Sequence, residues 1–570
     1  MEKLPKHLQK YIVEQNYEKY TPVDQAVWRY ILRQLKKFLG EHAHQAYLSG
    51  LEKTGISTEY IPRIEQVSAK LEKFGWRALP VSGFIPPAAF MELQSMSILP
   101  IASDMRSLEH LLYTPAPDIV HEAAGHAPIL ADEEYAQYLK EYAQVAKKAI
   151  MSQEDLNLYE AIRELSDIKE NPTSSPQQIH QAEEKLKTVS QQITFVSEAS
   201  ELSRMNWWTA EYGLIGSLEA PKIFGAGLLS SVGESKWCLS NQVKKIPLTL
   251  ECVKQTYDIT EPQPQLFVAR DFQHLKTVLH ELSETMAYKI GGLSALNKIL
   301  QAQTVNTVEL NNGIQISGKL KKYHLNPIDH SICYLQFEGP TQLSYRDHEI
   351  TGHSSRYHSQ GYGTPIGPIE NFDLHSLKLD QTYTLKYTSG VTVKGVLTKR
   401  VNLAADATLL TFSEATCEYN NLETKSVETL FQPEWGDYDI VITDKITSCF
   451  GGPADRNAFG EINDFVAARV PSAQITAEQK NIFNLYQQVR AFRESKNNNE
   501  IQFKELFLTL SKIASSEWLL FVELIEIGIQ QKFNFEFLKM IEFHLKTLAE
   551  KNQKCRSLIE DGLALAYAAN

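Results

Sequence analysis

Two histidines and an acid between residues 113 and 128 are the side chains best arranged for chemistry. His121 and His126 lie five residues apart, Glu122 follows the first of them, and prolines lie on both sides of the group. Imidazoles held by stiff backbone are common ligands of metal ions. The segment therefore predicts a metal site.

The five-residue gap argues against a zinc-protease helix. Such a helix places its histidines four residues apart, which brings them close to one face at about 3.6 residues per turn. A gap of five would rotate the two rings apart by roughly 140° on an ideal α-helix. Both rings can reach one ion only in an irregular or widened turn, which fits Pro115 and Pro117 just upstream.

A third ligand must come from elsewhere in the chain, and Glu211 is the best candidate. It lies in an otherwise apolar and aromatic run at residues 206–214. A carboxylate buried there without a partner would be costly, so it needs a metal ion or a cation. Two histidines and one carboxylate that leave positions open are the ligand set of non-haem Fe(II) oxygenases.

Several separated blocks resemble the pterin-dependent aromatic amino acid hydroxylase family, in particular its phenylalanine 4-monooxygenase-like members. Residues 113–128 resemble the family's iron-binding signature and residues 222–234 its second signature block, and residues 67–85 and 257–264 also match in order. The resemblance runs from about residue 20 to about residue 285. Because so few residues precede it, the amino-terminal regulatory domain of the animal enzymes is expected to be missing.

The resemblance implies the cofactors and the reaction. Fe(II) and a tetrahydropterin, either tetrahydrobiopterin or a related pterin, would activate O2 and hydroxylate the ring of a free aromatic amino acid. Conversion of L-phenylalanine to L-tyrosine, a step of phenylalanine catabolism, is favoured. The side chains expected around the substrate ring offer no evident hydrogen-bond partner for a phenol. Hydroxylation of tryptophan or tyrosine is the alternative within the family.

The resemblance also assigns site residues. The implied iron ligands are His121, His126 and Glu211, and Glu122 would be the catalytic acid near the pterin or, alternatively, a partner that orients an imidazole. The implied pterin contacts are Gly83, Ile85, Phe90 and Glu122, with Phe90 stacking on the pterin. The implied substrate contacts are Arg106, Thr114, Pro117, Trp207, Tyr212 and Ser230. The guanidinium of Arg106 would bind the substrate carboxylate through two parallel hydrogen bonds, in a bidentate contact.

Composition limits the class of protein. The 570 residues carry a net charge of −12, with 43% hydrophobic and 22% charged residues, which is ordinary for globular proteins and argues against nucleic acid as a partner. Six scattered cysteines without a C-x-x-C pair suggest free thiols in a reducing compartment. No export signal or membrane-spanning run is evident, so we expect a soluble cytoplasmic protein.

The pattern along the chain predicts a multidomain α+β protein. We expect a mainly helical iron and pterin domain at residues 1–300, with a charged helical insertion at about 140–200. Residues 301–470 read as a β-rich region, and residues 471–570 as helical again. The apolar stripes of these last helices need a partner surface, either among themselves or on another subunit of a homo-oligomer.

The β-rich region contains an internal repeat at residues 305–340 and 382–417. Gly313 and Gly390 begin matching patterns of glycine, apolar and lysine positions that are 77 residues apart. Between the copies, His348, His353 and His358 are spaced by five. A second metal site is one interpretation, although loop histidines are more often polar surface.

Two other functions compete with hydroxylation. The first is a metal-dependent hydrolase that uses His121 and His126, which the five-residue gap disfavours. The second is a β-repeat binding module joined to an inactive catalytic domain, which the presence of all three expected ligands disfavours.

Overall fold

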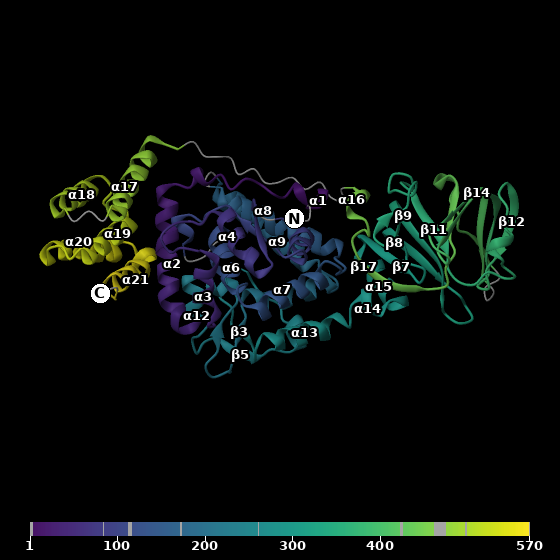
Figure 1. Cartoon of the computed structure of the whole chain (residues 1–570), viewed down its shortest axis with the longest axis horizontal. Coiled ribbons are helices and arrows are strands. Elements are labelled where there is room, and N and C mark those ends of the chain that lie inside the picture. The colour runs from purple at the N-terminus through teal and green to yellow at the C-terminus, as the bar shows by residue number, and fades with distance from the viewer. Residues whose placement is uncertain are drawn as a thin grey trace.

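The protein is described by a computed structural model that covers residues 4–83, 85–111, 117–171, 174–259, 261–421, 426–460, 475–495 and 499–568. Figure 1 shows three regions in a row. The first helical region (residues 4–302) lies in the middle, the β body (residues 305–451) at one end, and the C-terminal helices (residues 477–568) at the other.

The first helical region is built around amphipathic helices. The side chain of Thr21 accepts a hydrogen bond from the Asp24 amide and that of Asp24 from the Thr21 amide, so the longest helix begins with a capping box. The α-helices are α1 (Lys6–Gln9), α2 (Pro22–His42), α3 (Ala46–Thr54), α4 (Ile64–Leu71), α5 (Pro87–Ser95), α6 (Ala127–Ile129), α7 (Glu133–Ala146), α8 (Gln153–Glu170), α9 (Pro176–Gln191), α10 (Glu198–Asn206), α11 (Ala226–Leu229), α12 (Val232–Trp237), α13 (Phe272–Ser283), α14 (Ala287–Ile290) and α15 (Gly292–Ala302).

Two small sheets complete this region. The strands β1 (Arg77–Val81) and β2 (Ile98–Ala102) form a parallel pair, and a second sheet has the order β4-β3-β6-β5. Its strands are β3 (Leu214–Ile215), β4 (Lys222–Ile223), β5 (Lys244–Pro247) and β6 (Gln265–Ala269). Pro80 lies within β1, in the parallel pair with β2.

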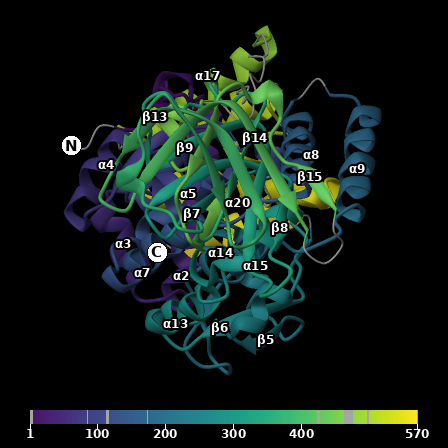
Figure 2. The ribbon, with the colours of Figure 1, turned by 90° about the vertical axis from the view of Figure 1, so that its right-hand side faces the viewer.

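The helices α8 and α9 pack against each other as a hairpin, in the segment where the sequence predicts a helical insertion. An ion pair joins Lys169 to Glu183 across the two helices at 3.0 Å, and Lys185 pairs with Glu164. In Figure 2 the hairpin stands at one side of the molecule. It is therefore an addition to the core that carries the histidines.

The β body contains two antiparallel sheets. The first has the order β10-β9-β8-β7-β17, with β11 also paired to β9, and the second has the order β12-β13-β14-β15, with β16 also paired to β14. The strands are β7 (Val305–Leu310), β8 (Ile314–Leu325), β9 (Ile332–Tyr345), β10 (His348–Glu349), β11 (Gly361–Pro365), β12 (Gln381–Lys386), β13 (Val391–Asn402), β14 (Thr408–Asn420), β15 (Val427–Thr429), β16 (Tyr438–Val441) and β17 (Ile446–Gly451). The short helix α16 (Arg456–Phe459) follows.

The two sheets repeat one antiparallel meander. The strands β7, β8 and β9 of the first correspond to β12, β13 and β14 of the second at the 77-residue spacing found in the sequence. Even the irregularities agree, because pairing shifts occur between Ser317 and Lys319 in one copy and between Lys394 and Val396 in the other. Equivalent bulges indicate that both copies fold in the same register.

The helix α15 joins the first helical region to the β body. Ala295, Leu296 and Ile299 on this helix are buried in the same apolar cluster as residues of β7, β8 and β9. A boundary at residue 300 therefore falls inside a helix whose apolar face packs on the sheet.

The C-terminal helices pack on α2 of the same chain. The phenol of Tyr30 donates a hydrogen bond to the backbone oxygen of Leu558 at 2.6 Å, and its ring contacts Trp518 edge-on. These helices are α17 (Ala477–Glu494), α18 (Glu500–Ile513), α19 (Trp518–Gln530), α20 (Phe535–Lys551) and α21 (Gln553–Ala568). Part of their apolar surface thus packs within one chain, whereas large side chains such as Phe535 and Phe543 are exposed. Among the described residues, no helix is long and apolar enough to span a bilayer.

Candidate metal centre

His121 and His126 lie on a π-helical turn, η4 (Val120–His126). A π-helix has hydrogen bonds that span five residues instead of four, and the Ala127 amide here donates to the Glu122 carbonyl. The wider turn brings the two imidazoles together, with ring centroids 4.9 Å apart. The structure thus contains the widened turn that the five-residue gap requires.

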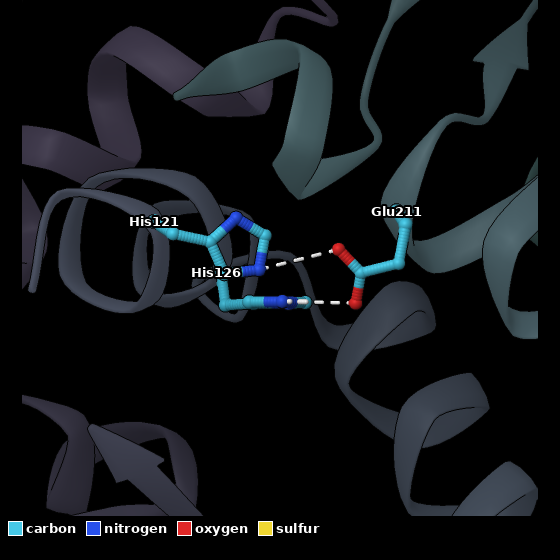
Figure 3. Close-up of side chains that lie close together, drawn as sticks. All are labelled: His121, His126 and Glu211. Atoms are coloured by element: carbon cyan, nitrogen blue, oxygen red, sulfur yellow. Dashed lines mark ion pairs between the residues drawn. The ribbon is translucent and has the colours of Figure 1, made fainter. Parts of the chain in front are cut away.

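Glu211 reaches the same point from a second π-helical turn, η5 (Trp207–Glu211), which continues α10. Its Oε2 lies 3.3 Å from His121 Nε2 and its Oε1 lies 3.3 Å from His126 Nε2 (Figure 3). The side-chain amide of Asn206 also donates a hydrogen bond to Glu211 Oε1 at 3.3 Å. Burial alone would raise the pKa of Glu211, but the positive charges of the His126 and His121 imidazoles, when these are protonated, outweigh it and hold the pKa far below its usual range.

The proton on His121 can be placed from its neighbour Ser230. The Ser230 hydroxyl donates to the Ala226 carbonyl at 2.7 Å, so its oxygen is left to accept a hydrogen bond from His121 Nδ1 at 3.2 Å. With the proton on Nδ1, the lone pair of His121 Nε2 faces the Glu211 carboxylate. Two electron-rich atoms in that arrangement need a cation between them.

The donor set suits a divalent iron ion. One donor atom from each of His121, His126 and Glu211 lies within 4.8 Å of the others, and they are two imidazole nitrogens and one carboxylate oxygen. This is the two-histidine, one-carboxylate set that leaves positions open on Fe(II). His126 is buried and its Nδ1 has no hydrogen-bond partner in the described part of the chain.

Arg106 is held beside this centre by Asp118. Its Nε and Nη2 donate to the two oxygens of Asp118 at 2.7 Å each, and Nη1 donates to the Ser230 carbonyl at 3.4 Å. Asp118 also accepts a hydrogen bond from the His121 amide at 3.0 Å. Burial would raise the pKa of Asp118, but the guanidinium of Arg106 outweighs it and keeps the pKa below its usual range.

Asp118 is a residue that the sequence analysis does not assign. The expected substrate anchor therefore meets a carboxylate of the chain itself. The signal was present in the sequence, because Asp118 is an acid in an otherwise apolar stretch three residues before His121.

Aromatic side chains form a stack beside Glu211. Trp207 lies between Tyr212, at 4.4 Å between ring centroids, and Tyr257, at 4.3 Å with planes 8° apart. Trp207 and Tyr212 are expected substrate contacts, whereas Tyr257 is not. The sequence offered one reason to expect Tyr257 near the site, namely its position in a block that resembles the family. Pro117 precedes η4 and is half-buried, and Thr114 lies outside the described residues.

Three of the four residues expected at the pterin lie near one another in the fold. Ile85 is buried in a small apolar cluster with Leu93 and Ile98, and Phe90 packs against it. The Gly83 amide donates to Asp104 at 3.1 Å, with a left-handed φ of 53° that favours glycine. Their cluster is separate from the main core.

Glu122 is buried next to the histidines. Burial raises its pKa to about 8, with a smaller opposing effect of His126. Within the described part of the chain no hydrogen bond joins its carboxylate to an imidazole, and its Oε2 has no partner. The contacts thus give no support to the alternative in which Glu122 orients a ring.

Comparison with known proteins identifies relatives of the first helical region. A family model described as biopterin-dependent aromatic amino acid hydroxylase matches residues 9–156 and 179–313. A phenylalanine-4-hydroxylase of Mesorhizobium japonicum is 30% identical over 270 residues, which are 47% of this chain and 82% of that protein. The phenylalanine-4-hydroxylase of Bos taurus is 30% identical over 273 residues, which are 47% of this chain but only 51% of that protein.

A solved structure also resembles part of the chain. Chromobacterium violaceum phenylalanine hydroxylase, with bound iron(III) and 7,8-dihydrobiopterin, covers 48% of this chain and 85% of its own at 25% identity and a TM-score of 0.38. In the family match, the gap between residues 156 and 179 lies within the hairpin of α8 and α9.

Proposed function

Because this chain belongs to the biopterin-dependent aromatic amino acid hydroxylases, and is thus a pterin-dependent non-haem iron monooxygenase, we propose that His121, His126 and Glu211 hold its iron. The observation that carries this assignment is the meeting of the three side chains on two π-helical turns, with both imidazoles 3.3 Å from the carboxylate. When bound, iron and reduced pterin supply the O2 activation that hydroxylates an aromatic ring. The side chains around them position the reactants.

Ser230 and Asp118 set the geometry of the iron ligands. Ser230 would accept a hydrogen bond from Nδ1–H of His121, which leaves Nε2 of that ring free to bind the ion. Asp118 fixes the backbone of the same histidine and the guanidinium of Arg106 at once. We therefore assign Ser230 an orienting role in addition to the expected substrate contact.

The proposed substrate is L-phenylalanine. Arg106 would hold its carboxylate, with Thr114 as a further contact, and Trp207, Tyr212 and Pro117 would form the walls of the ring slot. Relatives named phenylalanine-4-hydroxylase support this choice over tryptophan or tyrosine. Because tyrosines cover both faces of Trp207, its indole would border the slot with its edge.

The pterin would bind near Gly83, Ile85 and Phe90, with Glu122 as the acid that faces it. The burial of Glu122 and its raised pKa suit a group that carries a proton near neutral pH. The cytoplasm is the proposed compartment, residues 1–300 the proposed catalytic domain, and self-association through the C-terminal helices stays a prediction.

An activity assay tests the substrate assignment. Purified protein with Fe(II), O2, a tetrahydropterin and one aromatic amino acid at a time is expected to convert phenylalanine fastest. Faster turnover of tryptophan or tyrosine would overturn the substrate and leave the reaction class in place.

Metal analysis tests the ligands. His121→Ala, His126→Ala and Glu211→Ala should each lower iron occupancy and remove nearly all turnover, because each loses a bond to the ion. His280→Ala is the control, since that imidazole is exposed on α13. Full iron and activity in any of the three variants would refute the assignment.

A further inference from the structure

A second cluster of metal-binding side chains lies in the β body, outside the proposed iron site. His353 and His358 follow β9 in the loop that leads to β11, and Asp439 lies on β16 of the other sheet. All three are buried, with exposed fractions of 2%, 4% and 2%. His348, the third histidine of this segment in the sequence, is exposed on β10 and is not part of the cluster.

Three donor atoms of this cluster face one another. His353 Nδ1 lies 3.3 Å from His358 Nε2, and Asp439 Oδ2 lies 3.7 Å and 3.9 Å from these two nitrogens. The point equidistant from three atoms with those separations is about 2.1 Å from each, which matches the bond lengths of zinc to nitrogen and carboxylate oxygen. An ion fits between them, and closing the two longer separations by roughly half an ångström or less would give the tetrahedral arrangement that zinc prefers.

The cluster is poorly satisfied by the protein alone. Asp439 Oδ1 accepts a hydrogen bond from Thr411 at 2.6 Å, and the Tyr357 hydroxyl also acts on this carboxylate as a hydrogen-bond donor. Asp439 Oδ2, which faces the imidazoles, makes no hydrogen bond of normal geometry with the described part of the chain. The positive charge of Lys399 lowers the pKa of this carboxylate. In the described part of the chain, however, Lys399 and Asp439 do not form an ion pair within 4 Å. A buried carboxylate oxygen without a partner is costly, and a bound cation would remove that cost.

The internal repeat gives an independent reason to assign the imidazoles a function. At the 77-residue spacing, Leu430 and Trp435 occupy the second copy where His353 and His358 occupy the first. The meander therefore folds without imidazoles at these positions. The histidines occur only in the copy whose loop faces a carboxylate on the other sheet. The two sheets are also joined at this place by a hydrogen bond from the Val441 amide on β16 to the Thr364 hydroxyl on β11.

We propose that His353, His358 and Asp439 bind one divalent transition-metal ion of the zinc class, which ties the loop after β9 to β16 and so joins the two sheets. Two imidazoles and a carboxylate leave a fourth position of a tetrahedral ion open. The ring of Tyr357 lies edge-on to both imidazoles, at 5.7 Å and 4.7 Å, and borders the site on its exposed side. Water entering beside Tyr357 would complete the coordination.

The test counts metal ions on the full chain. The protein is stripped with a chelator, loaded with Zn²⁺ or Co²⁺, freed of unbound ion and measured by mass spectrometry. The wild type should hold two equivalents, because the proposed iron site also takes these ions. Asp439→Asn and His358→Gln should each hold one, whereas the matched control His348→Gln should hold two.

The melting temperature gives a second test, because an ion bound to the folded protein should stabilise it. Loading with Zn²⁺ is expected to raise the melting temperature of the His126→Ala variant, in which the iron site is disabled, but not that of His126→Ala combined with Asp439→Asn. One equivalent in the wild type that the Asp439→Asn protein retains, or two in both the Asp439→Asn and the His358→Gln proteins, would overturn the proposal. Neither result depends on hydroxylase activity.

Discussion

Asp118 connects the proposed substrate anchor to the proposed iron site. Its carboxylate forms a bidentate contact with the guanidinium of Arg106 and accepts a hydrogen bond from the backbone amide of His121. Arg106 and Asp118 are both buried, with 6% and 2% of their surface exposed. A substrate carboxylate that binds Arg106 would therefore be placed at a fixed distance from the ion.

Replacing Arg106 with alanine should impair both binding and folding. Loss of a charge-assisted contact worth about 1.5–3 kcal/mol would raise the Michaelis constant for the amino acid roughly 10- to 100-fold. The buried Asp118 would also lose its cation, which costs about 3–5 kcal/mol in the free energy of unfolding. Steady-state kinetics and urea denaturation measure the two effects.

Arg63→Ala is the control for that variant. Its partner Glu18 is 90% exposed, so its loss should change the free energy of unfolding by less than about 1 kcal/mol. An Arg106→Ala protein with an unchanged Michaelis constant would contradict the role as substrate anchor.

Residue types and spacing were enough to predict the three proposed ligands but not their neighbours. The gap between His121 and His126 required a widened turn, and an acid in an aromatic run required a cation. Asp118 is also an acid in an apolar run, but its partner, like that of Tyr257, could not be read from the sequence. Their partners lie 12 and 50 residues away along the chain, so no local periodicity reports the contact.

At the scale of elements, the π-helical turn η4 depends on close packing against α11. Gly125 lies between the two histidines, and a Cβ atom there would stand 2.6 Å from the backbone oxygen of Ala226. The helix α11 leads to Ser230, which orients His121. The absence of a side chain at Gly125 thus allows the ligand turn and its orienting residue to approach.

Gly125→Ala should therefore separate η4 from α11. We expect a loss of about 1–3 kcal/mol in the free energy of unfolding, as for overpacked cores, together with lower iron occupancy. The control is Gly40→Ala on α2, whose Cβ would make an ordinary contact of 3.6 Å with Leu48 and whose helix should gain up to about 1 kcal/mol. Full iron occupancy in the Gly125→Ala protein would show that this contact does not position the ligands.

Alternating apolar residues predicted strands in the β body, and the repeated glycines predicted the spacing between its copies. The sequence did not show that Asp439 of one sheet faces two histidines of the other, because that contact depends on how the sheets pack. Likewise, the apolar stripes after residue 475 predicted helices, but α2 as their partner surface could not be read from them.

At the scale of the whole molecule, a buried charge cluster joins the C-terminal helices to α2. Arg29 donates to Glu523 at 3.1 Å and to Glu526, and Glu59 lies 2.6 Å from its Nε. The side chains of Arg29, Glu523 and Glu526 are all less than 10% exposed. The C-terminal helices therefore cover a charged and apolar face of the region that carries the proposed iron site.

Arg29→Ala should loosen this attachment without touching the proposed iron ligands. Removing the guanidinium leaves Glu523 paired with Arg493 alone and Glu526 with Arg33 alone, so the cost should be smaller than the roughly 3–5 kcal/mol of a buried carboxylate left with no cation. Lys236→Ala is the control, because its pair with Asp561 joins the same two regions at 2.7 Å but is exposed. Hydrogen exchange should show faster exchange in α19 and α21 of the Arg29 variant alone, with iron content unchanged in both proteins. Equal protection of these helices in the two variants would show that the apolar contacts of Tyr30 and Trp518, and not the charges, hold the C-terminal helices in place.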